Sequence, residues 1–396
     1  MPMAMTSPHL LITTGIHKMK KALLPLALLA CAPIASAYAE ISFNGFANIV
    51  AGKASSGDTQ WGYDDDVDFK QDSLFALQAS TELSEGLSAT VQLISRGEND
   101  WDTEFEWAYL AYDLNDETRV LIGRQRAPMY MFSDYLDVSY AYPWITPPEG
   151  VYDLELSTYD GISASYAFTV GEFDANAQLV FGSETNEIEI LGQEVESEFD
   201  KIHGGSLTLN RDWLTLRAAY LLIDLTLPAP GVDELIAAWQ SVPGLEFIGD
   251  EATIIEEEAK FAEVGFQIDY NNWLVVGEYT HIEYEQMPLD VEKSLFFTAG
   301  YRFDNVLVHL TYGQDENEVN PTINALPFGV SPELDGLSAV TAQTFRFREQ
   351  DSSYYTLGAR WDFHDSAALK IEYSRLDNDL VNQDTNLVRT ALVTVF

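Results

Sequence analysis

The sequence feature that most constrains this chain is an alternation of apolar and polar side chains with a period of two. Between Ser294 and Asp304 the odd-numbered positions are apolar and most even-numbered positions are polar or small. Residues 259–270 and 354–363 follow the same scheme. Because successive side chains of a β-strand point to opposite faces, each stretch predicts a strand with one apolar and one polar face. No stretch after residue 40 approaches the roughly 20 apolar residues of a transmembrane helix.

Sixteen stretches of this kind predict sixteen strands. We place them at residues 41–51, 73–83, 87–95, 103–114, 118–125, 158–169, 173–183, 201–210, 213–225, 259–270, 273–285, 293–304, 306–314, 352–363, 367–377 and 386–396. The connections alternate in length. The short ones are rich in Asn, Asp and Gly and predict tight turns. The long ones predict loops, including 52–72, 126–157, 184–200, 226–258 (with two helical turns at Val232–Trp239) and 315–351.

This pattern favours a transmembrane barrel over a soluble β-sandwich. In bacterial outer-membrane barrels the apolar faces contact lipid, the polar faces line a wet interior, and short turns alternate with long outer loops. A sandwich would turn its apolar faces inward. Aromatic residues flank the tight turns, as in the belts at a lipid–water interface: Trp213, Tyr270, Trp273, Tyr301, Trp361 and Phe363. We predict one all-β domain over residues 40–396, a transmembrane antiparallel up-and-down β-barrel.

Residues 1–39 have the composition of a cleavable signal peptide. Three lysines between residues 18 and 21 form a basic start, residues 22–30 are apolar, and A-x-A cleavage sites lie within residues 35–39. This order of segments is typical of secretory leaders. We expect Met19 to be the true start, and the leader to be removed.

The mature chain is strongly acidic. The full sequence has 21 basic and 63 acidic residues, and losing three lysines and no acid with the leader moves the net charge from −42 to −45. Such a charge excludes nucleic acid as a partner. A hydrophobic content of 46% excludes a disordered acidic chain. The only cysteine, Cys31, is expected to leave with the leader, so no disulfide is predicted; processing of Cys31 as a lipoprotein site is the alternative.

Nothing in the chain predicts catalysis, a metal site or a cofactor. No G-x-S-x-G nucleophile elbow accompanies the histidines that follow the leader, which are His203, His281, His309 and His364. The acidic runs at 64–68 and 256–258 lack the spacing of a calcium-binding loop. We expect solvated outer-loop surfaces there, and a protein that is not an enzyme.

The chain resembles the Gram-negative porin family, in particular its sixteen-stranded general porins. The resemblance rests on the opening strand at residues 41–46, on the number of strands, and on a closing strand that ends in Phe396. It implies an outer-membrane location among lipid and lipopolysaccharide, and insertion by the barrel insertion machinery with Phe396 as the assembly signal. It further implies a homotrimer that packs through its first and last strands. Glu104 and Glu106 share the parity of Leu110 and Tyr112, which we interpret as an outward face in contact with protein.

The family folds its third long loop into the barrel, and residues 126–157 take that place after the fifth strand. Prolines stiffen this loop. If the loop pointed outward, its many aromatic side chains would form an exposed apolar surface prone to nonspecific contacts. The loop lacks the Pro-Glu-Phe-Gly-Gly signature of enteric porins; Pro147-Pro148-Glu149-Gly150 is a distant counterpart. We therefore expect an inward loop with a constriction of its own geometry.

A pore that filters by charge needs fixed charges facing each other across a narrow gap. We expect Asp134 and Asp137 of the loop on one side of this constriction. The opposing charges are expected from arginines of the wall and of the loop's first residue: Arg96, Arg124, Arg126 and Arg217. Further bases are expected on the lumen wall: Arg302, Arg360 and Lys370. The alternative for each arginine is an ion pair with a neighbouring acid that only holds the wall together.

These observations predict a porin through which small hydrophilic solutes diffuse passively. A mild preference for cations is expected because acids outnumber bases in the inward loop. Two alternatives remain open. One is a substrate-selective outer-membrane channel, and the other is a plugged barrel that serves adhesion or surface interaction.

Overall fold

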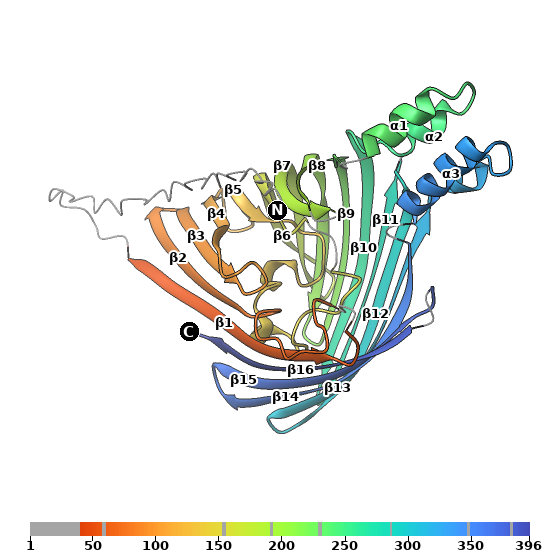
Figure 1. Ribbon diagram of the computed structural model, residues 1–396. Coiled ribbons are helices and arrows are strands. Elements are labelled where there is room, and N and C mark those ends of the chain that lie inside the picture. The colour runs from red at the N-terminus through yellow and green to blue at the C-terminus, as the bar shows by residue number, and fades with distance from the viewer. Residues whose placement is uncertain are drawn as a thin grey trace, which may run out of the picture. The chain divides into compact units, whose positions relative to one another are not determined.

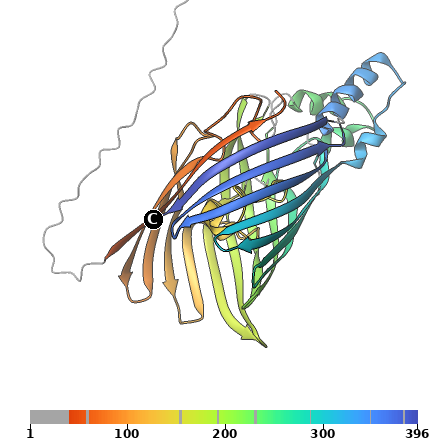
Figure 2. The ribbon, with the colours of Figure 1, turned by 90° about the horizontal axis from the view of Figure 1, so that it is seen from below.

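The computed structural model describes residues 40–396 except 58–60, 153–155, 191–192, 229–231, 286, 347–348 and 381–382. The predicted leader, with Met19 and Cys31, lies outside the described residues. Sixteen antiparallel strands form one closed barrel, in which each strand pairs with its neighbours in sequence and β16 pairs with β1 (Figures 1 and 2). The strands are β1 (Ile41–Ala54), β2 (Leu74–Ser84), β3 (Leu87–Arg96), β4 (Thr103–Asp113), β5 (Thr118–Arg126), β6 (Thr158–Val170), β7 (Phe173–Ile190), β8 (Gln193–Arg211), β9 (Leu214–Thr226), β10 (Glu257–Tyr270), β11 (Trp273–Tyr284), β12 (Leu289–Phe303), β13 (Val306–Val319), β14 (Gln350–His364), β15 (Ala367–Asn378) and β16 (Gln383–Val395).

The prediction of a sixteen-stranded antiparallel barrel is confirmed. One predicted loop, 184–200, is wrong, because β7 continues to Ile190 and β8 begins at Gln193. Acidic residues at alternate positions gave this segment the composition of a loop. They are spaced as in a strand, however: Val195, Ser197 and Phe199 are buried while the residues between them are not.

We call the end of the barrel that carries the tight turns the turn end, and the opposite end the loop end. The pairing of β1 with β16 is completed at the turn end, where Phe396 and Gly45 exchange backbone hydrogen bonds of 2.8 and 2.9 Å. The Phe396 ring lies on the outer wall, where it stacks on Phe75 with ring centroids 5.9 Å apart. Gly45 leaves room for this ring, since a Cβ at position 45 would lie 2.4 Å from it.

The outer wall is apolar, as the alternation predicts. On β12, Phe297 and Phe303 are about half exposed, whereas Phe296 and Thr298, on either side of Phe297, are buried. The aromatic residues predicted to flank the turns contact one another on neighbouring strands or along one strand: Trp213 with Tyr270, Trp273 with Tyr301, and Trp361 with Phe363. These rings gather at the turn end of the outer wall, where an interfacial belt is expected.

The side chains inside the barrel are more apolar than the alternation predicts. Many inward side chains of β9 to β13 are apolar and form one buried cluster with the aromatic residues of the inward loop. On β9 and β11 this gives strands that are apolar on both faces, because Leu221, Ile223, Leu274 and Val276 are buried beside lipid-facing neighbours. A continuous apolar run of this kind is typical of a strand that is buried on both sides.

A β-bulge changes the face of two acids that were assigned to the outer wall. Gln92 pairs with Trp107 and Leu93 pairs with Phe105, so β4 has one additional residue, Glu106. Such a bulge reverses the parity of the strand beyond it. Glu106 is consequently buried inside the barrel and Glu104 pairs with an inward residue of β3. The interpretation of Glu104 and Glu106 as an outward subunit contact is wrong.

Two loop-end connections carry the helices, which are α1 (Val232–Gln240), α2 (Glu246–Asp250) and α3 (Pro332–Phe345), with a 3₁₀ turn η3 at Pro321–Ala325. The predicted helical turns at Val232–Trp239 are confirmed as α1. The Trp239 indole N–H donates to the Thr341 hydroxyl at 2.8 Å, which joins α1 to α3. In the described part of the chain, no helix is long and apolar enough to cross a membrane.

The closure at Gly45 leads to a testable prediction. Gly45→Ala should lower the free energy of unfolding by about 1–3 kcal/mol, because the new methyl group is forced against the Phe396 ring and the Ala76 carbonyl. In a Phe396→Ala background part of this cost should disappear, because the ring is no longer there. Urea unfolding of the wild type, the two single variants and the double variant in lipid vesicles measures this coupling. Strictly additive effects would contradict the ring contact.

Candidate functional site

The connection from β5 to β6, residues 127–157, passes through the inside of the barrel (Figure 1). Its polar contacts reach strands all around the ring, from Asn48 of β1 through Arg96 of β3 and Glu278 of β11 to Lys370 of β15. A segment that contacts opposite walls of a closed barrel must cross its interior. The predicted inward fold of the third long loop is therefore confirmed.

A compact group of charges around Asp137 holds the first half of this loop. The two Asp137 carboxylate oxygens accept hydrogen bonds from Arg96 at 2.9 Å and from Arg126 at 2.5 Å. Both guanidinium groups also contact Glu106, each at 2.9 Å, and Arg96 pairs with Glu104 as well. We call these five residues the Asp137 clamp. It places two positive and three negative charges together, so both bases are compensated internally and the clamp has a net charge of −1.

The Asp137 carboxyl is ionised in this clamp. Burial acts to raise the pKa of Asp137, but the charges and hydrogen bonds of Arg96 and Arg126 outweigh it and hold the pKa below its usual value. A lowered pKa in the folded state means that the ionised group stabilises the fold at any pH above the ordinary value of 3.8. This contribution is lost as the pH falls through the lowered value.

The middle of the loop is held by bases that bind its backbone carbonyls. Lys370, which is 1% exposed, donates to the carbonyl of Tyr142 at 2.9 Å and also to those of Ser139 and Trp144. Arg360 donates to the carbonyls of Tyr140 and Tyr142 at 2.7 and 2.9 Å.

Contacts with tyrosine rings of the loop add to the hydrogen bonds of Lys370 and Arg360. The Arg360 guanidinium lies 4.8 Å from the Tyr140 ring centroid, and the Lys370 ammonium lies 5.0 Å from that of Tyr142. Such cation–π contacts are worth more in a desolvated site than at the surface.

Arg389 of β16 holds the far part of the loop, and its role could not be seen from the sequence. It donates to Thr146 of the loop at 2.9 Å and pairs with Asp72 and Glu372 at 3.0 and 2.9 Å. Glu372 in turn accepts the backbone N–H of Ile145 at 2.8 Å. The strand parity of 386–396 contains the signal for an inward Arg389, but the partners are distant in sequence.

A buried acid and an arginine hold the apolar side of the loop. Glu278 accepts the backbone N–H of Met131 at 2.9 Å and the Tyr152 hydroxyl at 2.5 Å. Arg217 donates to the carbonyl of Pro128 at 2.7 Å and lies 3.6 Å from Glu263. Arg217 thus fixes the start of the loop.

Aromatic packing seals the loop against the wall. Trp144 is buried and donates its indole N–H to Thr311 at 2.9 Å, and its ring meets Phe296 at 5.4 Å between centroids. A cavity of about 10 Å³ lies near this contact, around Trp61, Trp144 and Arg389. A space of this size holds at most one water molecule.

Asp134 differs from the other charged residues predicted for the site. It belongs to a 3₁₀ turn, η1 (Ser133–Tyr135), between the Asp137 clamp and the start of the loop. Its side chain is exposed, and it has neither a hydrogen bond nor an ion pair within the described ranges. Asp134 is therefore a fixed negative charge that faces the water of the lumen.

Arg124 and Arg302 have no contact with the inward loop in the part of the chain that the structure describes. Arg124 lies on the parity of the lipid-facing Ile122 and pairs with Glu184 at 2.6 Å and with Asp160 at 3.2 Å. Arg302 forms two hydrogen bonds with Asp269, of 2.6 and 2.8 Å, near the turn end.

The site as a whole is a loop fixed across a barrel by buried charges, and Asp134 is its unpaired carboxylate toward the water within the described residues. The described residues contain no group of three or more metal-ligating side chains. What the arrangement can do is narrow a water path and give the narrow part a charge.

The Asp137 clamp yields the second prediction. At pH 7, Asp137→Asn should lower the free energy of unfolding by about 1.5–3 kcal/mol, the usual cost of losing hydrogen bonds to a charged group. The difference from wild type should shrink below pH 3.8, as the wild-type carboxyl becomes protonated. Asp134→Asn is the matched control in the same loop and should change stability by less than about 0.5 kcal/mol. Equal effects of the two variants on the urea midpoint in vesicles would contradict the clamp.

Solved structures with a similar fold are outer-membrane proteins. The anion-selective porin from Comamonas acidovorans aligns with a TM-score of 0.57 and 13% identity, over 90% of this chain and 100% of that chain. Salmonella typhi OmpF, solved with daunomycin, aligns with a TM-score of 0.56 and 14% identity, over 90% and 98%. The trimer form of in-vitro folded OmpT, an outer-membrane protein of Vibrio cholerae, aligns with 0.54 and 12%, over 90% and 99%. At these identities the likeness is one of fold.

No curated protein gives a significant match to this chain. A family model does match: the one described as Gram-negative porin covers residues 23–379. That range takes in fifteen whole strands and the loop that crosses the barrel. The chain therefore belongs to the Gram-negative porin family, and it is a channel of the outer membrane.

Proposed function

We propose that this channel lets small hydrophilic solutes diffuse passively and mildly prefers cations. The observation that carries the preference is the difference between Asp134 and the bases around it. Asp134 is exposed and unpaired among the described residues, whereas Arg96, Arg126 and Arg217 each bind an acid or a loop carbonyl. A narrow pore with low-dielectric walls focuses the field of a single unpaired charge.

The composition of the remaining interior supports passive diffusion. The inward faces of β6, β7 and β8 toward the turn end carry small neutral polar side chains, which are Ser163, Ser165, Gln178, Ser206 and Thr208. Such a wall offers hydrogen bonds to water and solutes without a strong site for either ion sign. The open water path is expected between this wall and the exposed part of the loop.

The third prediction concerns charge selectivity. Asp134→Asn should lower the cation-over-anion permeability ratio by about twofold, since one charge ~8 Å from an ion in water-like surroundings is worth ~0.5 kcal/mol. The reversal potential in a KCl gradient across a planar bilayer measures this ratio. The effect should grow from 0.1 M to 0.01 M salt, where the Debye length increases from ~10 to ~30 Å.

The matched control removes two carboxylates from the first outer loop, Asp65→Asn with Asp66→Asn. Both side chains are exposed and lie away from the inward loop. This pair should change the ratio much less than Asp134→Asn does. Equal changes would place the selective charge elsewhere. The alternative function is a plugged, surface-interacting barrel, which the extensive contact of the loop with the wall supports. Insertions of wild-type protein that carry no current would favour this alternative.

We further propose that the chain forms a homotrimer. The outer face of β1 to β3 is lined by small residues between its larger apolar ones, which are Ala47, Ala51, Ala79 and Ala89. Small residues allow close approach of neighbouring backbones in a membrane. Three of the turn-end aromatic pairs lie on β9 to β14, which suits a wall that meets lipid. The trimer form of the similar Vibrio cholerae OmpT supports this assembly.

The fourth prediction follows from this face. Ala47→Trp with Ala79→Trp should lower the detergent-corrected mass from three subunits to one, because two large rings cannot fit between closely packed walls. The same pair of tryptophans on the lipid-facing wall, at Leu310 and Leu357, should leave the trimer intact. A wild-type mass of one subunit in light scattering would contradict the proposal.

Further partners are proposed from the outer wall and from the loop end. The exposed Phe396 ring, beside Phe75, is accessible for recognition by the barrel insertion machinery as the assembly signal. The acidic loops at the loop end would meet lipopolysaccharide through divalent ions, and the apolar wall would meet lipid. Small hydrophilic solutes are the only cargo that we propose.

A further inference from the structure

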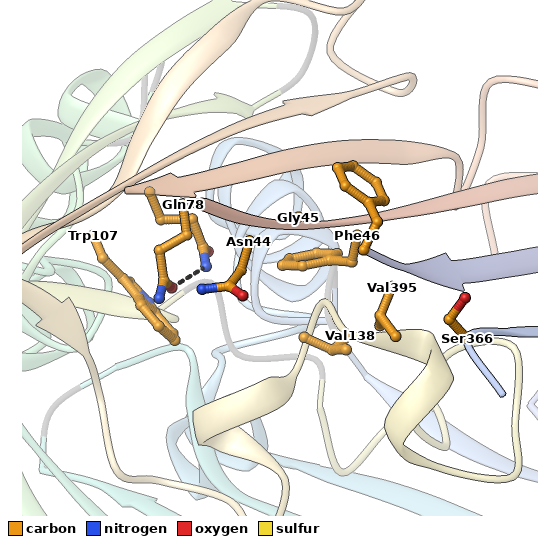
Figure 3. A pocket seen from close by; sticks show the side chains of 10 residues that line it. Asn44, Gly45, Phe46, Gln78, Trp107, Val138, Ser366 and Val395 are labelled. Atoms are coloured by element: carbon orange, nitrogen blue, oxygen red, sulfur yellow. Dashed lines mark hydrogen bonds between the residues drawn. The ribbon is translucent and has the colours of Figure 1, made fainter. Parts of the chain in front are cut away.

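Beneath the inward loop, toward the turn end, lies a hollow of about 500 Å³. Figure 3 shows Asn44, Gln78 and Trp107 gathered at one side of it, with Val138 of the loop and Val395 of β16 at the other. Its volume is within the range of pockets that bind small molecules. It lies next to the loop but does not include Asp134 or the Asp137 clamp.

Hydrogen-bonding side chains form a row along one wall of this hollow. Asn44 of β1 pairs in register with Gln78 of β2, Gln78 pairs with Gln92 of β3, and Gln92 pairs with Trp107 of β4. Four neighbouring strands therefore present their polar groups at one level of the barrel. Gln92 donates to the Gln78 side-chain oxygen at 3.0 Å, which fixes the centre of the row.

The row retains free donors and acceptors. The Asn44 side chain is exposed and makes no hydrogen bond with any residue that the structure describes. The Trp107 indole N–H is likewise without an acceptor in the described ranges. A buried donor without a partner costs about 1–3 kcal/mol, and an incoming acceptor would remove that cost.

The side chains that line the hollow are uncharged, although the sequence has a net charge of −42. No charged side chain is among the ten residues that line it, and Phe46, Val138 and Val395 are apolar. The charge at this wall is the main-chain carboxylate of Phe396, which repels anions. Arg96 and Asp137 of the clamp are paired with each other. A charged solute would lose water and find no charged side chain as a partner, so the hollow favours uncharged solutes.

We propose that this hollow is a binding subsite for an uncharged, polyhydroxylated solute of one or two sugar rings. Side-chain amides donate and accept at once, as sugar hydroxyl groups do, and an indole offers an apolar face together with one N–H donor. The proposal rests on the proposed function, since it adds a neutral-solute site on the periplasmic side of the constriction to a channel for hydrophilic solutes.

The test compares three probes on the full protein in planar bilayers. Maltose is the neutral sugar, glucuronate is a charged sugar, and a polyethylene glycol of similar size has a chain of ether acceptors only. Added from the turn end, maltose should reduce the current with a saturable concentration dependence, and the other two should do so more weakly at equal concentration. Calorimetry of maltose binding to the detergent-solubilised protein gives an independent reading that needs no current.

Variants of the row locate the effect. Gln78→Leu should raise the half-saturating maltose concentration about fivefold to tenfold, and Trp107→Phe about twofold to fivefold, as expected for lost hydrogen bonds. Gln267→Leu is the matched control, because Gln267 is an inward amide of β10, on the side of the ring opposite β2 and outside the hollow. It should leave the maltose effect unchanged. If Gln78→Leu does not fold, Gln92→Asn replaces it in the same comparison.

Each contrary result is distinct. Equal effects of maltose and glucuronate, or of Gln78→Leu and Gln267→Leu, would overturn the subsite. Wild-type channels that conduct but show no maltose effect would overturn it as well, and would leave the diffusion function standing. Silent insertions with calorimetric maltose binding that Gln78→Leu weakens would support the subsite and remove the diffusion function.

Discussion

Closure of the hydrogen-bonded sheet is the constraint on which the rest of this structure depends. A backbone that crosses lipid finds no water for its N–H and C=O groups, so a sheet in a bilayer has to be free of open edges. The pairing of β1 with β16, completed by Gly45 and Phe396, removes both edges. Once the ring is closed, side-chain alternation assigns each residue to lipid or to the interior, and the interior is where charged groups can find partners.

The interior is divided into regions of different polarity by the loop that crosses it. Toward β9 to β13 the loop packs against apolar side chains and excludes water. Toward β3 and β15 it is held by ion pairs and by bonds from Lys370 and Arg360 to its carbonyls. In the proposed channel, solutes use the space beside Asp134 and the hollow below Val138. The loop fills much of the barrel, and in this proposal the few groups that it leaves exposed decide what passes.

The sequence predicts the barrel well because a period of two is a local property that each strand carries for itself. It predicts the clamp in part, because Asp137, Arg96 and Arg126 are recognisable as charges of the right kind but their pairing depends on which strands face each other. It could not predict Arg389 with Asp72, since these residues come from opposite ends of the chain. The single additional residue in β4 also escaped it, because a bulge breaks the parity on which the assignment of Glu104 and Glu106 rested.

The way in which the loop is anchored has a consequence for how such a pore can change over time. Lys370, Arg360, Arg217 and Asn48 all bind main-chain oxygens of the loop, and every residue type supplies a main-chain oxygen. Substitutions of the exposed side chains in η1 therefore leave these anchors in place. The scaffold and the proposed filter are therefore separable: a single mutation can exchange the charge at position 134, and the barrel does not have to be rebuilt for a different set of solutes.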